Sequence, residues 1–184
     1  DADGDEVSTT LIITINGAND APVANPDTNW IVEDGTSPIT GNVIDGQAHN
    51  GAPDAVNRAD VADTDVDVET LTVAAADTGT INGTYGVLTL NSNGTYSYRL
   101  YTQGENPSAY ATVQALKEGD LPLADTFNYN AFDGTAESNQ TSLTISIFGS
   151  NDAPVVGSAT VATSDEGFSY GNQDLVGNPT DTTN

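Results

Sequence analysis

Carboxylates at alternate positions are the side chains with the clearest chemistry in this sequence. Asp63, Asp65, Asp67 and Glu69 alternate in the segment ADTDVDVET. In an extended segment, residues two apart point to the same side and lie about 6 to 7 Å apart, so their charges repel. Ca²⁺ takes six to eight oxygen ligands and favours carboxylates. The segment therefore predicts a calcium site, with a solvated acidic loop as the alternative.

Two other acidic groups occur twice in the chain. Asn19-Asp20 recurs as Asn151-Asp152, each pair followed by Ala-Pro, and Glu33-Asp34-Gly35 recurs as Asp165-Glu166-Gly167. Both recurrences have the same spacing of 132 residues. Acidic residues that recur at one place in a repeat suggest ion sites where neighbouring domains meet.

The recurrence belongs to a longer internal repeat. Residues 9–22 (TTLIITINGANDAP) align with residues 141–154 (TSLTISIFGSNDAP). Self-similarity at a fixed spacing is typical of tandem domains. We therefore expect the C-terminal strand of one repeat at residues 1–18, a complete β-sandwich repeat at 19–150 and the N-terminal part of a following repeat at 151–184. On this interpretation the chain is a segment of a longer protein.

Within the complete repeat, apolar and polar residues alternate with a period of two, which indicates half-buried strands. Asn93-Gly94 predicts a hairpin turn between two of them. Residues 109–117 are the one segment expected to be helical, and residues 45–69 are expected to form an irregular loop. The pattern predicts an all-β protein, an antiparallel β-sandwich with flanking partial repeats. The alternating segments are Leu88–Leu90, Tyr96–Leu100, Phe127–Phe132 and Leu143–Ile147.

The expected order of strands assigns the acidic groups to the two ends of the sandwich. A first strand at residues 22–33 carries the chain away from its entry, and a second strand at residues 39–44 returns towards it. We therefore predict one Ca²⁺ cluster at the entry and a second at the exit. The entry ligands are Asn19, Asp20, Asp63, Asp65 and Asp67, with Asp133 as an additional ligand; the exit ligands are Glu33, Asp34, Asn151 and Asp152.

Composition excludes several classes of partner. The chain of 184 residues has 27 acidic and 3 basic side chains, a formal net charge of −24, and neither cysteine nor methionine. Such a charge repels nucleic acid and anionic membrane surfaces. The absence of cysteine excludes disulfides and thiolate metal sites. No window reaches the roughly 18 apolar residues of a membrane-spanning helix, so no membrane insertion is expected.

An enzymatic function is not expected. His49 is the single histidine and lies in a segment rich in Gly and Asn, where we expect it to be exposed, so a Ser-His-Asp site has no credible assembly. The three cations, Arg58, Arg99 and Lys117, are expected in local ion pairs. A calcium-dependent carbohydrate-binding module is the alternative function, with Trp30 and tyrosines as stacking surfaces for a polysaccharide. For Tyr96 and Tyr98 we favour cross-strand packing on one face.

The ordered series of motifs resembles the VCBS repeat, a cadherin-like, bacterial immunoglobulin-like domain of giant RTX adhesins. The series runs from NDAPVANPD through VEDGTSPITGNVIDG, DTDVDVETLTV and GTYGVLTLNSNGTYSYRL to SLTISIFGSNDAP. The resemblance implies an extracellular, calcium-rigidified extender, exported by type I secretion, that projects an adhesive tip for cell attachment and biofilm formation. Its implied partners are neighbouring repeats, joined through calcium-bridged linkers. The commoner family loop has the form DxDGD, whereas this chain has Val68 and Glu69 there, which makes Glu69 a doubtful ligand.

Overall fold

The computed structural model describes residues 3–4, 6, 8–35, 37–67 and 69–152. The chain divides into two units, residues 1–150 and 151–184, and the elements below all belong to the first. Eleven strands and two short helices are assigned in the described part. They are β1 Asp27–Val32, β2 Ile39–Asn42, β3 Gln47–His49, β4 Arg58–Asp60, β5 Thr72–Val73, η1 Ala75–Asp77, β6 Gly79–Asn82, β7 Gly86–Leu90, β8 Thr95–Leu100, α1 Pro107–Val113, β9 Leu123–Tyr129, β10 Ala131–Phe132 and β11 Thr141–Phe148.

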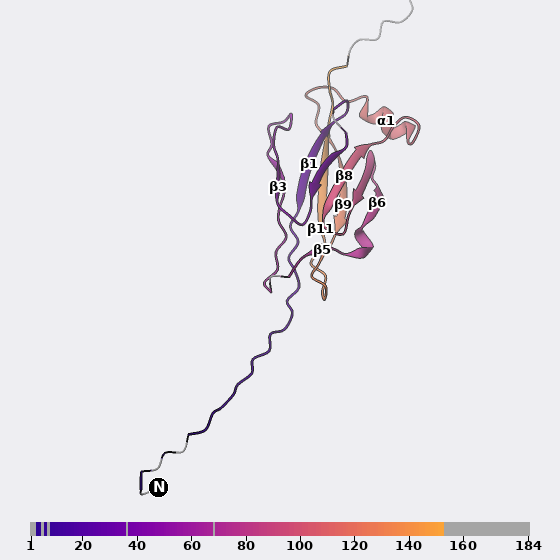
Figure 1. The fold of residues 1–184 in the computed structure, drawn as a ribbon. Coiled ribbons are helices and arrows are strands. Elements are labelled where there is room, and N and C mark those ends of the chain that lie inside the picture. The colour runs from indigo at the N-terminus through magenta and orange to yellow at the C-terminus, as the bar shows by residue number, and fades with distance from the viewer. Residues whose placement is uncertain (1–2, 5, 7, 36, 68, 153–184) are drawn as a thin grey trace, which may run out of the picture. The chain divides into compact units, whose positions relative to one another are not determined.

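Two sheets form the body of this unit (Figure 1). One has the strand order β1-β11-β9 and the other has the order β2-β8-β7-β6, while β10-β5 and β3-β4 are separate pairs. All strand pairs are antiparallel except β1 and β11, which run parallel with Asp27 opposite Leu143. Parallel neighbours need a long connection between them, and nearly the whole repeat separates β1 from β11. The predicted all-β sandwich is confirmed.

The core lies between the two sheets and follows the alternation seen in the sequence. Leu143, Ile145 and Ile147 of β11 are buried, and the residues between them are partly exposed. From β8, Tyr98 is fully buried and its ring meets that of Phe127 edge to face, with 5.9 Å between centroids. The polar–apolar alternation therefore predicted the inward face correctly on these strands.

The hairpin predicted at Asn93-Gly94 is confirmed, since it joins β7 to β8. Gly94 has a φ of 85°, a left-handed conformation that glycine adopts without strain. Its amide donates to the carbonyl of Asn91 at 3.0 Å, and the carbonyl of Gly94 accepts from the amide of Val43 at 3.0 Å. The turn therefore also holds the chain that follows β2.

The prediction of an irregular loop over residues 45–69 is wrong between residues 47 and 60. This segment contains the β3–β4 hairpin, which lies against β1 (Figure 1). Side chains make the connection: Thr28 Oγ1 accepts from the Ala59 amide at 3.1 Å, and Asp27 Oδ1 accepts from the Val61 amide at 2.8 Å. Two strands of three residues with few apolar side chains gave no period-two signal in the sequence.

Two further boundaries differ from the sequence prediction. Helix α1 starts earlier than residues 109–117 because Asn106 caps its N-terminus by accepting from the Ala109 amide at 3.1 Å. It also ends earlier, at Val113. The segment 127–132 is divided: β9 ends at Tyr129, and β10 pairs with β5 instead of β11.

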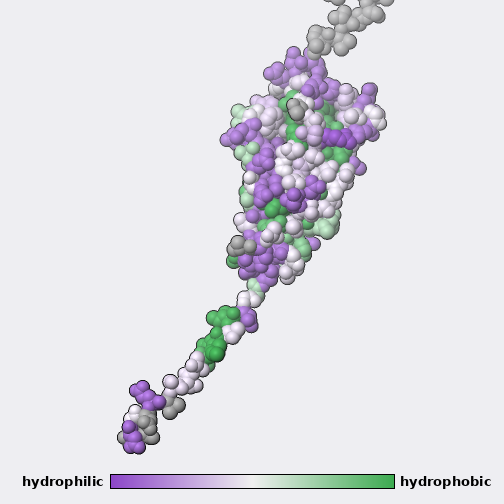
Figure 2. Space-filling model, in the orientation of Figure 1, coloured by the Kyte–Doolittle hydropathy of each residue, from purple (hydrophilic) through white to green (hydrophobic). Residues whose placement is uncertain are grey.

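Residues 8–18 carry no assigned strand, and their apolar side chains are exposed. Leu11, Ile12, Ile13 and Ile15 each expose more than two thirds of their surface, and the N-terminal segment shows green patches of hydrophobic residues in Figure 2. That these residues complete a preceding repeat stays a prediction.

Candidate metal centre

Backbone pairing fixes the entering segment, residues 19–25, against the acidic loop. Val23 and Thr64 exchange both amide-to-carbonyl hydrogen bonds, at 2.8 and 3.0 Å. The Asn25 amide donates to Asp63 Oδ1 at 2.7 Å. These contacts bring the start of the repeat beside residues that follow about forty positions later in the chain.

The turn between β10 and β11 holds the same entering segment from another direction. Asn139 accepts from the Ala24 amide at 3.1 Å and donates its side-chain amide to the Ala24 carbonyl at 2.9 Å. Asn19 donates its side-chain amide to Asp133 Oδ2 at 2.9 Å. Three separate segments therefore meet where the chain enters the sandwich.

At this junction, Asp65, Asp67 and Glu69 form a group of carboxylates. One oxygen of each lies within 4.8 Å of the others. Asp65 Oδ1 accepts from the Asp67 amide at 2.7 Å, a local turn that folds the loop back and allows Glu69 to face Asp65. Partial desolvation, with the charges of Asp65 and Asp67 adding to it, raises the pKa of Glu69. A bound cation would remove this repulsion.

The other oxygen of Asp65 shows that these residues fit a metal ion. Asp65 Oδ2 is buried and has no hydrogen-bond partner among the residues that the structure describes. A buried oxygen of this kind costs about 1 to 3 kcal/mol of desolvation unless a partner satisfies it. Ionised neighbouring carboxylates have no hydrogen to donate to it, whereas a hard cation can bind all of them.

Other predicted entry ligands lie next to this group. The Asp20 amide donates to Asp67 Oδ2 at 2.8 Å, so the Asn-Asp pair of the linker touches the loop. Asp133 Oδ1 accepts from the amides of Thr135 and Ala136, at 2.6 and 2.7 Å. The Ala136 amide, followed by Asn19, lowers the pKa of the Asp133 carboxyl. Asp133 is therefore held as an anion beside the linker.

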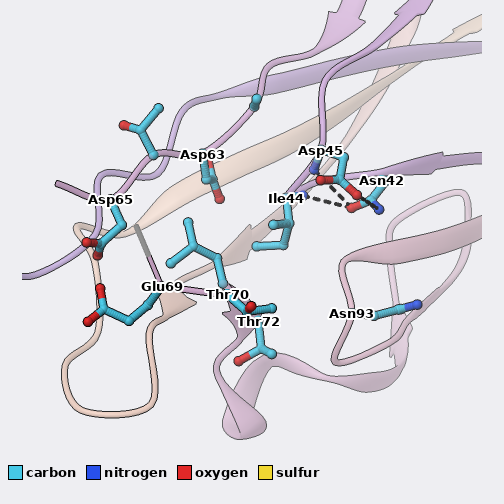
Figure 3. A pocket seen from close by; sticks show the side chains of 12 residues that line it. Asn42, Ile44, Asp45, Asp63, Asp65, Glu69, Thr70, Thr72 and Asn93 are labelled. Atoms are coloured by element: carbon cyan, nitrogen blue, oxygen red, sulfur yellow. Dashed lines mark hydrogen bonds between the residues drawn. The ribbon is translucent and has the colours of Figure 1, made fainter. Parts of the chain in front are cut away.

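Asp63 has a different environment from its neighbours. Its Oδ1 accepts from the Asn25 amide, and its Oδ2 lies 3.2 Å from the Tyr129 hydroxyl. Burial raises the pKa of Asp63 to about 6. In Figure 3 its carboxylate is set apart from the facing carboxylates of Asp65 and Glu69. The close acidic group thus contains Glu69, which the sequence treated as doubtful, and does not contain Asp63.

A cavity of about 660 Å³ opens beside the acidic group. Asp63, Asp65 and Glu69 lie on one side of it, while Asn42 and Asp45 lie beyond Ile44 (Figure 3). Asn42 donates its side-chain amide to Asp45 Oδ2 at 2.8 Å, so Asp45 already has a partner. The cavity gives solvent and ions access to Asp65 and Glu69.

The predicted exit residues meet the end of β11. Glu33 Oε1 accepts from the Ser150 amide at 2.7 Å, and Asp34 Oδ2 accepts from the Ser150 hydroxyl at 3.2 Å. Glu33 and Asp34 therefore lie at the point where the chain leaves the first unit. Asn151 and Asp152 belong to the second unit, and their part in an exit site stays a prediction.

The sequence missed a set of buried polar residues inside the sandwich. Asp27, Asn29, His49, Asp60 and Asp125 are all buried. The prediction that His49 is exposed is wrong: its Nε2 lies 2.8 Å from Asp60 Oδ2, and its carbonyl accepts from the Trp30 indole at 3.1 Å. These polar side chains interrupt the apolar pattern, and the alternation of apolar and polar residues assigns polar side chains to the solvent face.

The remaining sequence expectations concern aromatic and basic residues. Tyr96 and Tyr98 are buried, which confirms their predicted packing and removes both as sugar-stacking surfaces. Arg58 pairs with Asp54 at 2.8 Å, and Arg99 pairs with Glu105 at 2.6 Å, as expected of local ion pairs. Each arginine lowers the pKa of its carboxylate partner to about 2.

Comparison with known families assigns the fold. The model of the bacterial cadherin-like domain matches residues 19–149, and the chain belongs to this family. Domains of the family typically bind calcium and are generally not enzymes. A search of curated proteins found no match.

Within the described residues, no helix has the length and apolar character needed to cross a membrane.

Proposed function

We propose that this domain is a calcium-stabilised extender of a large bacterial surface adhesin, one link in a tandem stalk that projects adhesive domains for attachment and biofilm formation. The observation that carries the proposal is the acidic group at the entry junction, where Asp65 Oδ2 is buried without a partner in the described part of the chain. A family whose members are cadherin-like supports an extracellular, adhesion-type role. Export by type I secretion follows from the RTX resemblance.

The residues proposed to hold the ion are Asp65, Asp67 and Glu69, with Asn19, Asp20 and Asp133 beside them. We leave Asp63 out because it lies outside the close acidic group and its Oδ1 accepts from the Asn25 amide. Bound Ca²⁺ supplies positive charge that offsets the repulsion among these side chains. No chemical step is involved, since the proposed role of the ion is to fix the entering linker to the loop.

The position of the group explains how calcium would stiffen a stalk. Residues 19–25 are where a preceding repeat would join, and they already contact the loop at Thr64 and the turn at Asn139. An ion bound at Asp67 and its neighbours would add a further connection between the loop and the linker at Asp20. We propose an equivalent role at the exit for Glu33, Asp34, Asn151 and Asp152, so that neighbouring repeats are the partners.

Calcium titration by calorimetry tests the binding half of the proposal. We expect an affinity in the 10⁻⁴ to 10⁻³ M range typical of extracellular modules, with Mg²⁺ a poor substitute because it demands a tighter octahedron.

The proposal that calcium stiffens a stalk is tested by small-angle scattering from a segment of several consecutive repeats, with calcium and then without. A maximum dimension that does not shorten on calcium removal would contradict the extender proposal.

A calcium-dependent carbohydrate-binding module remains the second candidate. Trp30 lies on the wall of a groove of about 570 Å³, together with Pro38 and Ile39. The indole is held in place by its hydrogen bond to the His49 carbonyl, and a fixed aromatic face is suited to stacking on a sugar ring. Binding of the isolated chain to a glycan array in calcium, lost in Trp30→Ala, would favour this function over the spacer.

A further inference from the structure

The Tyr129 hydroxyl lies among more acceptors than it can serve. Within 3.5 Å of its oxygen are Asp27 Oδ2, the Val43 and Asn25 carbonyls, and both carboxylate oxygens of Asp63. The two shortest distances are 2.8 Å to the Val43 carbonyl and 2.9 Å to Asp27 Oδ2. A phenol has one hydrogen to donate. One of these two oxygens must therefore either go unpaired or bring a hydrogen of its own.

Counting hydrogens decides which oxygen that is. A carbonyl carries no hydrogen, and Val43 is completely buried, so its oxygen needs the Tyr129 proton. Asp27 is 1% exposed, and its two oxygens face the Val61 amide and Tyr129. If Asp27 carries a proton on Oδ2, it donates to the Tyr129 oxygen and Tyr129 donates to Val43, so both of the shortest contacts are hydrogen bonds.

The other buried carboxyls of the sandwich have enough donors without a proton of their own. Asp60 faces the Asn42 amide, His49 Nε2 and the Tyr96 hydroxyl. Asp125 faces the amides of Thr84 and Tyr85 and the Tyr98 hydroxyl. Asp27 differs from both because its Oδ2 faces the Tyr129 hydroxyl, whose hydrogen is donated to the Val43 carbonyl.

The charged groups around Asp27 reinforce this difference. Asp60 on β4 and Asp63 after β4 face it with negative charge, and Tyr96 and Tyr129 face it as phenols. Of the nearby basic side chains, Arg58 on β4 is paired with Asp54, and His49 on β3 lies against Asp60. Strand β11, which pairs with β1, carries no titratable side chain. Burial first, and then the charges of Asp60 and Asp63, raise the pKa of Asp27 to about 7.

We propose that Asp27 is protonated in the folded domain at mildly acidic to neutral pH and donates its proton to Tyr129, which makes the calcium-free fold more stable in mild acid than in alkali. The unfolded chain releases this proton near pH 4, the ordinary value for aspartate. The folded state therefore holds one extra proton between about pH 4 and 7. The stabilisation is complete below that window and is lost as pH rises through it.

Urea unfolding in calcium-free buffer, followed through the single tryptophan Trp30, measures the effect. One extra proton makes the unfolding equilibrium constant rise about tenfold per pH unit between pH 5 and 6.5. Other carboxylates contribute in this range, so the comparison is between wild type and Asp27→Asn. The asparagine amide donates to Tyr129 at any pH. We therefore expect the unfolding equilibrium constant of this variant to rise with pH by about tenfold less per pH unit than that of wild type.

Asp45→Asn is the matched control because it removes the same charge from an exposed aspartate. It should keep the wild-type dependence. An Asp27→Asn variant with the wild-type dependence would overturn the proposal. If that variant does not fold, the ¹³C shift of the Asp27 carboxyl in wild type decides: a resonance still protonated at pH 6 supports the proposal, and titration near pH 4 refutes it.

Discussion

Single residues at the entry junction carry the proposed calcium site. Asp65 contributes a turn through Oδ1 and, through Oδ2, a buried oxygen that is unpaired among the described residues, while Asp67 accepts from the linker at Asp20. Replacing both aspartates by asparagine removes two negative charges but keeps the size of each side chain. We expect calcium affinity to fall at least a hundredfold in calorimetry, since Ca²⁺ affinity follows ligand charge.

Asp45→Asn again serves as the control in that experiment, because Asp45 lines the same cavity but already accepts from Asn42. Its calcium affinity should stay within a few-fold of wild type. An equal loss in both variants would mean that calcium responds to general negative charge, and the proposed site would be abandoned.

Asp125 is a second residue whose role can be tested alone. It receives hydrogen bonds from the Thr84 and Tyr85 amides and from the Tyr98 hydroxyl, and it is 1% exposed. Asp125→Ala leaves three buried donors without an acceptor, so we expect a loss of about 3 kcal/mol or more in urea unfolding. Glu118→Ala, at an exposed turn, should change the stability by less than about 0.5 kcal/mol.

At the level of the elements, the β7–β8 turn connects the core to the site region. Gly94 has a φ of 85°, and a Cβ there would meet Asn42 Oδ1 and two carbon atoms of Ile44. Gly94→Ala combines backbone strain with a clash, and we expect a loss of about 1 to 3 kcal/mol by urea denaturation. At Gly104 an added Cβ meets nothing within 4 Å, so Gly104→Ala should be close to neutral.

The elements also show how far the sequence could be interpreted. Strands such as β8 and β11 were predictable because one of their faces is apolar and the other is polar. Strand β1 breaks that rule by turning Asp27 and Asn29 inward, where tyrosine hydroxyls and backbone amides satisfy them. Such partners come from distant parts of the chain, so no local pattern could reveal them.

The candidate site was predictable to a similar extent. The alternation of acidic residues predicted that Asp63, Asp65 and Asp67 lie on one side of the chain. That prediction holds only where the backbone is extended. Thr64 still pairs with Val23, so Asp63 follows the strand and faces inward, whereas Asp65 turns the chain by accepting from Asp67. That turn separates Asp63 from the group and brings in Glu69, a result that depends on loop geometry.

For the whole molecule, the formal charge of −24 is a cost of folding that bound cations can offset. The acidic residues are not spread evenly: the described unit gathers Asp65, Asp67 and Glu69 where the chain enters and Glu33 and Asp34 where it leaves. In a tandem stalk these positions would lie at successive junctions. Calcium would then stabilise each domain and, in the same step, order the linkers between them.

Thermal unfolding of this chain in excess Ca²⁺ and then in chelator tests the central claim most directly. Calcium at about a hundred times its dissociation constant contributes about 2.7 kcal/mol to the folded state, which corresponds to a rise in Tm of roughly 5 to 10 °C for a domain of this size. We predict that rise with calcium and a much smaller one with Mg²⁺ at equal ionic strength. A Tm that stays within about one or two degrees on chelation would contradict it.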